Sequence, residues 1–211
     1  MDGVVTAPRE RPLHIGVTGG IGSGKSTVGR LLAGDRGIWI DVDAISHALT
    51  APGGAAMSAL VEAFGEDIAA PDGSLNRVHM RALAFSDRSA RQRLEAVLHP
   101  LIGAEAESRA EAGRQAGAPC VVFDVPLLVE SGRWRARVDR VLVVDCEPGT
   151  QVRRVQARSG WPEADVHRVI AQQATRNARR AVADAVIVND RDDLDGLRLA
   201  VHRLRVAWRL D

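Results

Sequence analysis

The stretch "GGIGSGKST", residues 19–27, decides the fold of this chain. It follows an apolar, strand-like run at 13–18, "LHIGVT", and leads into a helical stretch at 25–34. Four of its residues fit the phosphate-loop pattern GxxxxGK[ST], namely Gly19, Gly24, Lys25 and Ser26. Glycines let backbone amides converge on phosphate oxygens, and the N-terminal end of the following helix adds positive potential. The strand, loop and helix together predict a site for a nucleoside triphosphate.

Lys25 is the only lysine in the chain, although lysine and arginine together number 28. Lysine carries a compact charge on a flexible stem that reaches the β and γ phosphates, whereas the planar fork of arginine has a different shape. The Ser26 hydroxyl is the metal contact of this pattern, so Mg²⁺ is expected beside the nucleotide. The expected ATP-binding residues are Gly20, Gly22, Ser23, Gly24, Lys25, Ser26 and Thr27. The loop predicts nucleotide binding but does not say which reaction follows.

Short runs rich in Val and Ile alternate along the chain with helical patterns. Because these runs are continuously apolar, they fit strands buried on both faces of a parallel sheet. The runs lie at 13–18, 37–42, 120–125, 141–145 and 185–189, and helical stretches at 25–34, 148–158 and 192–209 follow the first, fourth and fifth. This order predicts an α/β chain with a phosphate-loop NTPase fold, in which a five-stranded, mainly parallel sheet forms the nucleotide-binding core.

The connection between the second and third strands is too long for a simple crossover and reads mostly as helix. We expect a helical subdomain at 50–117, inserted between two parts of the core, 13–49 and 118–211. Its last part, 87–117, has the pattern of one long helix or two consecutive ones. A second helical segment, dense in arginine, is broken at "SGWP", where Pro162 can open a new helix.

Composition restricts the partners and the compartment. The net charge of +1 gives no broad field for nucleic acid or an anionic membrane, and no apolar run approaches the roughly 18 residues of a membrane span. Residues 1–12 lack the apolar stretch of a signal peptide and are expected to be a loose extension. Cys120 and Cys146 lie in apolar runs and match no metal spacing, so we expect reduced core thiols in a cytoplasmic protein. As a separate expectation, the protein is a monomer or small homo-oligomer.

Three aspartates lie at the end of an expected strand or just after it and are candidates for the site. Strand ends in open α/β sheets face the ligand crevice, which places Asp41 and Asp43 of "IDVDAISH" near the phosphate loop. Asp43 is either a general base for an acceptor hydroxyl or the N-cap of a helix beginning at Ala44. Asp124 of "CVVFDVP" is either a metal or water-shell ligand or a structural group hydrogen-bonded within the loop. The residues alone leave both pairs of alternatives open.

The combination of several motifs resembles the dephospho-CoA kinase family over about 13–205. These are the phosphate loop with its flanks, "IDVDAISH", "VLHPLI", "VPLLVES", "RVLVVDCEPGTQVRR" and "IAQQATRNARRAVADAVIVN", in this order. The phosphate loop alone is shared with many kinases, while the DxD combined with HPLI and PLLVE is far more particular. The resemblance implies transfer of the γ phosphate of ATP to the ribose 3'-hydroxyl of dephospho-CoA, giving CoA and ADP.

The resemblance also implies roles for residues that match the family's motifs. Asp43 becomes the general base, Lys25 stabilises the transferring phosphoryl group, and Arg154 closes over it from a lid at about 150–180. Arg158 is a weaker candidate for the same work. Residues 50–117 become the acceptor subdomain, with His99, Pro126 and Leu127 as candidate contacts of the acceptor; His99 before Pro100 can equally mark only a bend. Arg176 and Arg179 either touch phosphates or meet acidic neighbours and solvent.

Some features depart from the family or leave rivals open. Asn189 is followed by Asp190 and Arg191 where the family often has Gly, which puts the adenine contacts in doubt. Another small-metabolite or nucleoside monophosphate kinase of the same fold would share the loop and the lid, but HPLI and PLLVE argue against it. A GTPase switch would need a guanine-reading NKxD, and the sequence contains none.

Overall fold

The computed structural model describes residues 11–211, so residues 1–10 of the expected extension lie outside the described part. Arg11 and Pro12 belong to the folded chain. Arg11 forms an ion pair with Asp139 (Nη2 to Oδ1, 2.6 Å), and Pro12 is buried immediately before the first strand. The described chain divides into two compact units, one formed by the residues up to Ile40 together with Ala112–Asp211, and the other by Asp41–Glu111.

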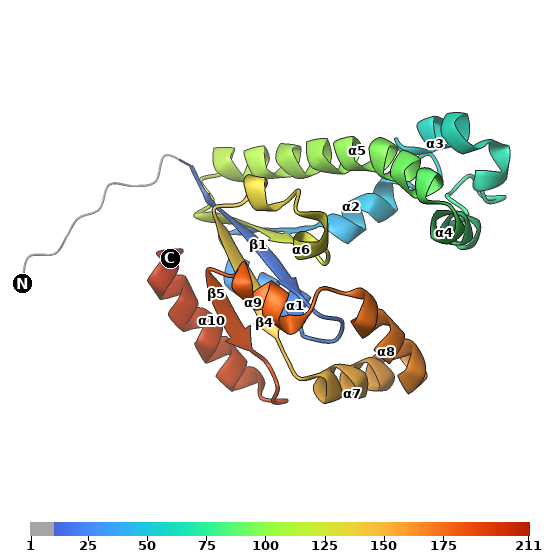
Figure 1. Ribbon diagram of the computed structural model, residues 1–211. Coiled ribbons are helices and arrows are strands. Elements are labelled where there is room, and N and C mark those ends of the chain that lie inside the picture. Colours follow the sequence, from blue (N-terminus) through green and yellow to red (C-terminus); the bar gives the residue numbers. More distant parts are fainter. Residues whose placement is uncertain (1–10) are drawn as a thin grey trace, which may run out of the picture. The chain divides into compact units, whose positions relative to one another are not determined.

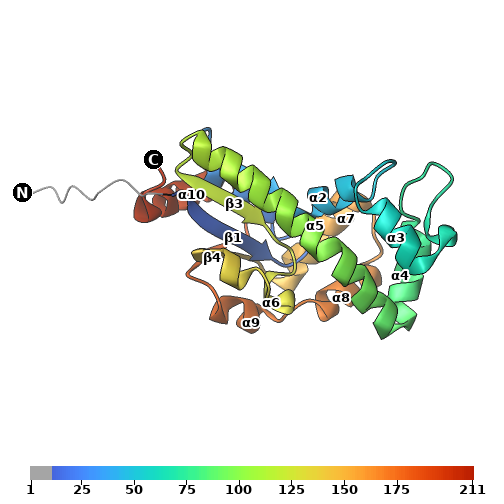
Figure 2. The same cartoon turned by 90° about the horizontal axis from the view of Figure 1, so that it is seen from above.

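A five-stranded sheet organises the first unit, and the expected fold class is confirmed (Figure 1). The strands are β1 Leu13–Gly19, β2 Ile38–Asp41, β3 Cys120–Asp124, β4 Arg140–Asp145 and β5 Ala185–Val188. Their order is β2-β3-β1-β4-β5, and β1 pairs in parallel with both β3 and β4, as β4 does with β5. Figure 2 shows β3, β1 and β4 side by side, with the phosphate loop following the central strand.

One face of the sheet is covered by α1 Lys25–Ala33 and α10 Leu194–Trp208. Alternate strand residues point to this face because side chains along a strand have a period of two. The resulting buried core combines Ile15, Val17, Val122, Leu142 and Val144 of the strands with Val28, Leu32, Leu197 and Val201 of the helices. This packing fixes the position of α1, whose N-terminus carries the phosphate loop.

Short elements lie against the other face, where α6 Leu128–Ser131 and η2 Arg135–Arg137 follow β3. A Cβ atom added to Gly16 of β1 would lie 2.6 Å from Leu128 Cδ1, so the close approach of α6 explains a glycine in a central strand. The "PLLVE" turn is therefore held directly over β1.

The arginine-rich segment forms three helices, α7 Pro148–Ser159, α8 Glu163–Gln172 and α9 Arg176–Ala181. Gly160 ends α7 in the left-handed conformation (φ 66°), and Pro162 is the N-cap of α8, as the "SGWP" break predicts. Val152, Val155 and Val166 form a small core between α7 and α8, and Ile21 of the phosphate loop packs against it.

The second unit is helical. It contains α2 Val42–Leu49, α3 Met57–Phe64, η1 Glu66–Ile68, α4 Arg77–Ser86 and most of α5 Arg88–Gln115, around a core that includes Leu60, Ile68 and Met80. The stretch at 87–117 gives one helix rather than two, with Pro100 inside it. Among the helices of residues 11–211, none combines the length and apolar character needed to cross a membrane.

Candidate functional site

The phosphate loop has the backbone geometry that its glycines predict. Gly22 and Gly24 have φ of 72° and 88°, in the left-handed region that favours glycine. Gly24 is the N-cap of α1 without a side-chain cap, so the first amides of the helix keep their capacity for an anion. A Cβ atom on Gly20 would lie 2.0 Å from the buried Gln151 Nε2, so any other residue there would have to displace the Gln151 side chain.

Lys25, Ser26 and Asp124 meet at the end of β3. Asp124 is 1% exposed; its Oδ1 pairs with Lys25 Nζ, and its Oδ2 accepts a hydrogen bond from Ser26 Oγ (2.8 Å). The Lys25 side chain is 15% exposed, so its ammonium group sits at the boundary between core and solvent. The arrangement places one cation and one carboxylate beside the amides of a phosphate-binding loop.

These oxygen atoms also suit a hard cation. The hydroxyl of Ser26 and the carboxylate of Asp124 are the donor types that Mg²⁺ prefers, and Mg²⁺ usually takes only one or two protein ligands together with water and substrate phosphates. Residues 11–211 contain no group of three or more His, Cys, Asp or Glu able to hold a metal by themselves. The donor set thus fits a nucleotide-bound Mg²⁺ better than a metal held by protein ligands alone.

Asn189 supports the loop from the end of β5. Its Nδ2 donates to the carbonyl oxygen of Ser23 (2.8 Å), and a Cβ atom on Gly24 would lie 2.5 Å from the same nitrogen. The sequence pointed to Asn189 only as a neighbour of the adenine, and this contact with the loop backbone was missed. No local pattern reveals it, because the two partners are separated by 166 positions.

Arg154, the expected catalytic clamp, makes its hydrogen bonds to the segment that follows β5. Nη1 donates to the carbonyl of Asn189 (2.7 Å), Nη2 to the carbonyl of Arg191 (2.9 Å), and Nε to Asp192 Oδ1 (3.1 Å). These contacts hold the loop beside Asn189 in place. Arg158, the weaker candidate, is exposed and its Nε donates to the hydroxyl of Ser159 (3.3 Å).

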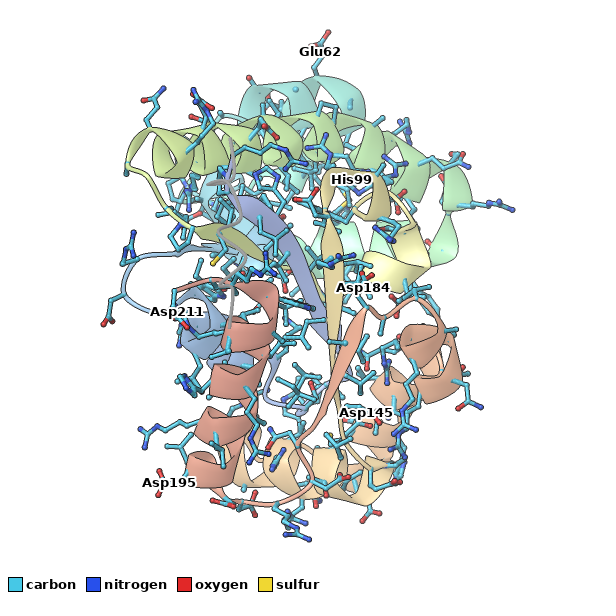
Figure 3. The ribbon with its side chains drawn as sticks, turned by 90° about the vertical axis from the view of Figure 1, so that its left-hand side faces the viewer. Glu62, His99, Asp145, Asp184, Asp195 and Asp211 are labelled. Carbon is cyan, nitrogen blue, oxygen red and sulfur yellow. The ribbon has the colours of Figure 1, made fainter. Side chains whose placement is uncertain are left out.

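Arg176 and Arg180 of α9 converge on Asp145 at the carboxyl end of β4 (Figure 3 labels Asp145). Arg176 donates to both carboxylate oxygens (3.0 and 2.9 Å) and also pairs with Glu147 (2.6 Å). Burial opposes ionisation of Asp145, but the hydrogen bonds from the two arginines outweigh it and lower its pKa, while the same contacts raise the pKa of Arg176. Of the two alternatives for Arg176, the structure therefore shows contact with acidic neighbours, Asp145 and Glu147.

The ends of the arginine-rich segment are tied to the loop and to the "PLLVE" turn. The amide of Ile21 donates to Gln173 Oε1 (3.0 Å), and the amide of Ala174 donates to Glu130 Oε1 (2.7 Å). Sequence reasoning assigned neither Gln173 nor Glu130 an individual role. Within the same turn, Pro126 accepts a hydrogen bond from Thr18 Oγ1 through its carbonyl (3.2 Å), and Leu127 is 49% exposed.

In the second unit, the two aspartates of "IDVDAISH" are distinguished. Asp41 is the N-cap of α2, since its carboxylate accepts from the amide of Ala44 (2.9 Å), and Asp43 lies in the first turn. The alternative that Asp43 caps a helix beginning at Ala44 is therefore wrong, because the helix begins at Val42 and takes the preceding carboxylate as its cap. His99, labelled in Figure 3, lies within α5, which continues through Pro100.

Comparisons with known proteins indicate the same family as the sequence motifs. The family model described as dephospho-CoA kinase matches residues 13–195. The chain is 54% identical over 190 residues to the dephospho-CoA kinase of Burkholderia lata, covering 90% of this chain and 93% of that protein. It is 55% identical over 195 residues to the dephospho-CoA kinase of Bordetella pertussis, covering 92% and 90%.

Solved structures share the fold. TT1252 from Thermus thermophilus superposes with a TM-score of 0.77 at 34% identity, covering 93% of this chain and 98% of that one. Dephospho-CoA kinase from Campylobacter jejuni gives 0.62 at 19% identity over 90% and 94%, and shikimate kinase from Acinetobacter baumannii gives 0.54 at 19% over 96% and 97%, so both support the fold alone. With the family model spanning most of the chain and relatives above half identity, the chain belongs to the dephospho-CoA kinase family.

Proposed function

We propose that this chain transfers the γ-phosphoryl group of ATP to the ribose 3'-hydroxyl of dephospho-CoA, producing CoA and ADP. Membership of the family makes the chain a kinase, and the kinase fold implies the use of ATP. The observation that carries the proposal is the meeting of Lys25, Ser26 and Asp124 at the phosphate loop. It provides a cation and a metal-binding oxygen pair for the phosphates, as phosphoryl transfer requires.

The phosphate loop is the proposed ATP site. Its residues are those expected from the sequence: Gly20, Gly22, Ser23, Gly24, Lys25, Ser26 and Thr27. The uncapped N-terminus of α1 would receive a phosphate through its amides. Lys25 would turn from Asp124 toward the nucleotide, exchanging a carboxylate partner for phosphate oxygens.

Mg²⁺ is the proposed metal, with Ser26 and Asp124 as the residues that would hold it or its water shell. When bound, it would reduce the negative charge of the phosphates. Asp124 already contacts both Lys25 and Ser26, so its carboxylate would have two roles. One is to position these two side chains, and the other is to hold the metal or its water shell.

Asp43 is the proposed general base. Asp41 satisfies the amide at the start of α2, so the capping role does not have to be filled by Asp43. A carboxylate following a strand of this sheet has the chemistry to accept the proton of the acceptor hydroxyl as that oxygen attacks. The helical segment at 50–117 with His99, together with Pro126 and Leu127, is the proposed acceptor site, and residues 150–180 are the proposed lid.

Arg154 is proposed as a catalytic residue that closes over the transferring phosphoryl group, and its contacts suggest a second, structural role. Its contacts support a function in ordering the backbone at Asn189 and Arg191. A conformational change that brings the guanidinium to the phosphates would have to break these hydrogen bonds.

We further propose that the protein acts in the cytoplasm on small molecules, as a monomer or small homo-oligomer, without nucleic acid or membrane partners. Cys120 and Cys146 are both buried as thiols, which suits a reducing compartment. The near-neutral net charge of +1 suits small anionic substrates that are recognised locally.

The test is release of ADP from ATP and Mg²⁺ with dephospho-CoA, AMP, CMP, shikimate or gluconate as acceptor. We expect strong release with dephospho-CoA alone, accompanied by formation of CoA. Preferential release with another acceptor would contradict the proposal and favour a different metabolite kinase of the same fold. A Lys25→Met variant assayed beside it reports ADP that comes from a contaminating kinase.

A further inference from the structure

The first half of the phosphate loop forms a hydrogen bond with a side chain from a distant part of the sequence. The amide of Ile21 donates to Gln173 Oε1 at 3.0 Å, across 152 positions of sequence. Gln173 is the C-cap of α8 and has extended backbone angles (φ −84°, ψ 157°), so its side chain leaves the helix at the loop. The remaining side of Ile21 packs against the apolar core of α7 and α8.

The position of Gln173 is in turn fixed through its neighbour Ala174. The amide of Ala174 donates to Glu130 Oε1 (2.7 Å), and its carbonyl accepts from Arg179 Nη1 (2.6 Å). Both main-chain polar groups of one residue are thus satisfied by side chains from different elements, α6 and α9. These two hydrogen bonds hold the connection between α8 and α9 beside the loop.

Arg179 adds a packing contact to this arrangement. It is only 5% exposed, and a Cβ atom on Gly20 would lie 3.1 Å from its Nη2. Burial lowers the pKa of its guanidinium, while the Glu130 carboxylate opposes that effect. Glu130 therefore serves both the Ala174 amide and the charge of Arg179 beside the loop.

A phosphate loop binds through amides that must already point inward, so a loop ordered before binding loses less entropy on binding. We propose that Gln173 is a positioning residue for ATP, which pre-organises the loop through the amide of Ile21, and that Glu130 acts through Gln173. The proposal rests on the proposed function only in taking ATP as the nucleotide. It gives the "PLLVE" glutamate a role distinct from contact with the acceptor.

The test compares Gln173→Met, which keeps length but loses the acceptor oxygen, with Gln172→Met at the adjacent, exposed helix position. We expect Gln173→Met to raise the Kd for ATP about five- to tenfold, as loss of one hydrogen bond predicts. Exchange of the Ile21 amide with solvent should accelerate by about tenfold or more. Gln172→Met should change neither quantity.

Glu130 is tested by a conservative substitution and by a double-mutant cycle with Gln173. Glu130→Gln keeps an acceptor for the Ala174 amide and should retain most of the ATP affinity, whereas Glu130→Met should lose it. If Glu130 acts through Gln173, adding Glu130→Met to Gln173→Met should have little further effect on the Kd for ATP. Equal losses in both backgrounds would overturn the indirect role of Glu130.

Two results would overturn the role of Gln173. One is an unchanged Kd for ATP in Gln173→Met despite a lowered melting temperature, which is what a purely structural residue gives. The other is unchanged exchange at the Ile21 amide. Both measurements are made on the full chain without an acceptor, so they stand even if dephospho-CoA is not phosphorylated and the proposed function fails.

Discussion

Replacing Asp124 by asparagine tests how the phosphate loop is stabilised before nucleotide binds. Asp124 is 1% exposed and pairs with Lys25, whose side chain is 15% exposed. Removing one partner of a buried ion pair costs about 3–5 kcal/mol. Because Lys25 keeps some contact with water and the asparagine oxygen can still accept from Ser26, we expect a loss of about 2 kcal/mol. For a chain of this size, that loss lowers Tm by roughly 4–8 °C.

The assay is thermal unfolding without nucleotide, by calorimetry, of the wild type, Asp124→Asn, Lys25→Met and the double variant. The cost of Asp124→Asn should shrink in the Lys25→Met background, because the unpaired ammonium group is then absent. Asp35→Asn is the matched control, since Asp35 is exposed in the turn after α1, where a substitution changes stability by about 0.5 kcal/mol or less.

Two outcomes would refute this reasoning. If Asp124→Asn melts within about 1 °C of the wild type, the pair does not stabilise the loop. If the losses of the two single variants add up to the loss of the double variant, Asp124 acts through Ser26 or through the backbone rather than through the charge of Lys25.

Further predictions concern catalysis, acid stability and thiol chemistry. Asp43→Asn should keep the Kd for ATP while kcat falls about 100-fold or more, and normal turnover would remove Asp43 as the base. Lys25→Arg should lose about 100-fold in kcat/KM although the charge is kept; near-normal activity would show that shape is unimportant. The pKa of Asp145 is lowered by folding, so its contribution to stability is complete above its unfolded value of about 4 and disappears as pH falls through the folded value. The melting temperature should therefore fall less between pH 7 and pH 3 for Asp145→Asn than for the wild type. An equal fall in both proteins would contradict this. Burial raises the pKa of the Cys146 thiol to about 11, so iodoacetamide at pH 8 should modify the native protein far more slowly than the urea-unfolded protein, which mass spectrometry would follow.

The sheet could be predicted from the sequence because its signal is local. Each strand is a continuous Val- and Ile-rich run, and β3 at Cys120–Asp124 and β4 at Arg140–Asp145 begin and end within about one residue of the expected runs. The break between α7 and α8 could also be predicted, because glycine commonly ends a helix in the left-handed conformation and proline is favoured at a helix start.

The partners of the polar side chains could not be predicted in the same way. Arg154 and Arg176 have the same charge and lie in similar arginine-rich stretches, yet one binds carbonyls after β5 and the other a buried carboxylate. Likewise, Asp41 and Asp43 are both suitable caps, and only the start of α2 at Val42 distinguishes them. Sequence gives the chemistry of these groups, while long-range folding decides what each one meets.

The single lysine turns the phosphate loop into a chemically addressable position. Because Lys25 carries the only ε-amine of the chain and pairs with Asp124, an amine-directed label on a side chain can report only from this loop. The rate at which Lys25 is modified, followed by the mass of its peptide, would measure how often Lys25 leaves Asp124. A ligand that contacts the ammonium group would slow the modification. A fluorinated or isotopically enriched lysine would likewise give one assigned signal, so the site can be observed spectroscopically without mutation.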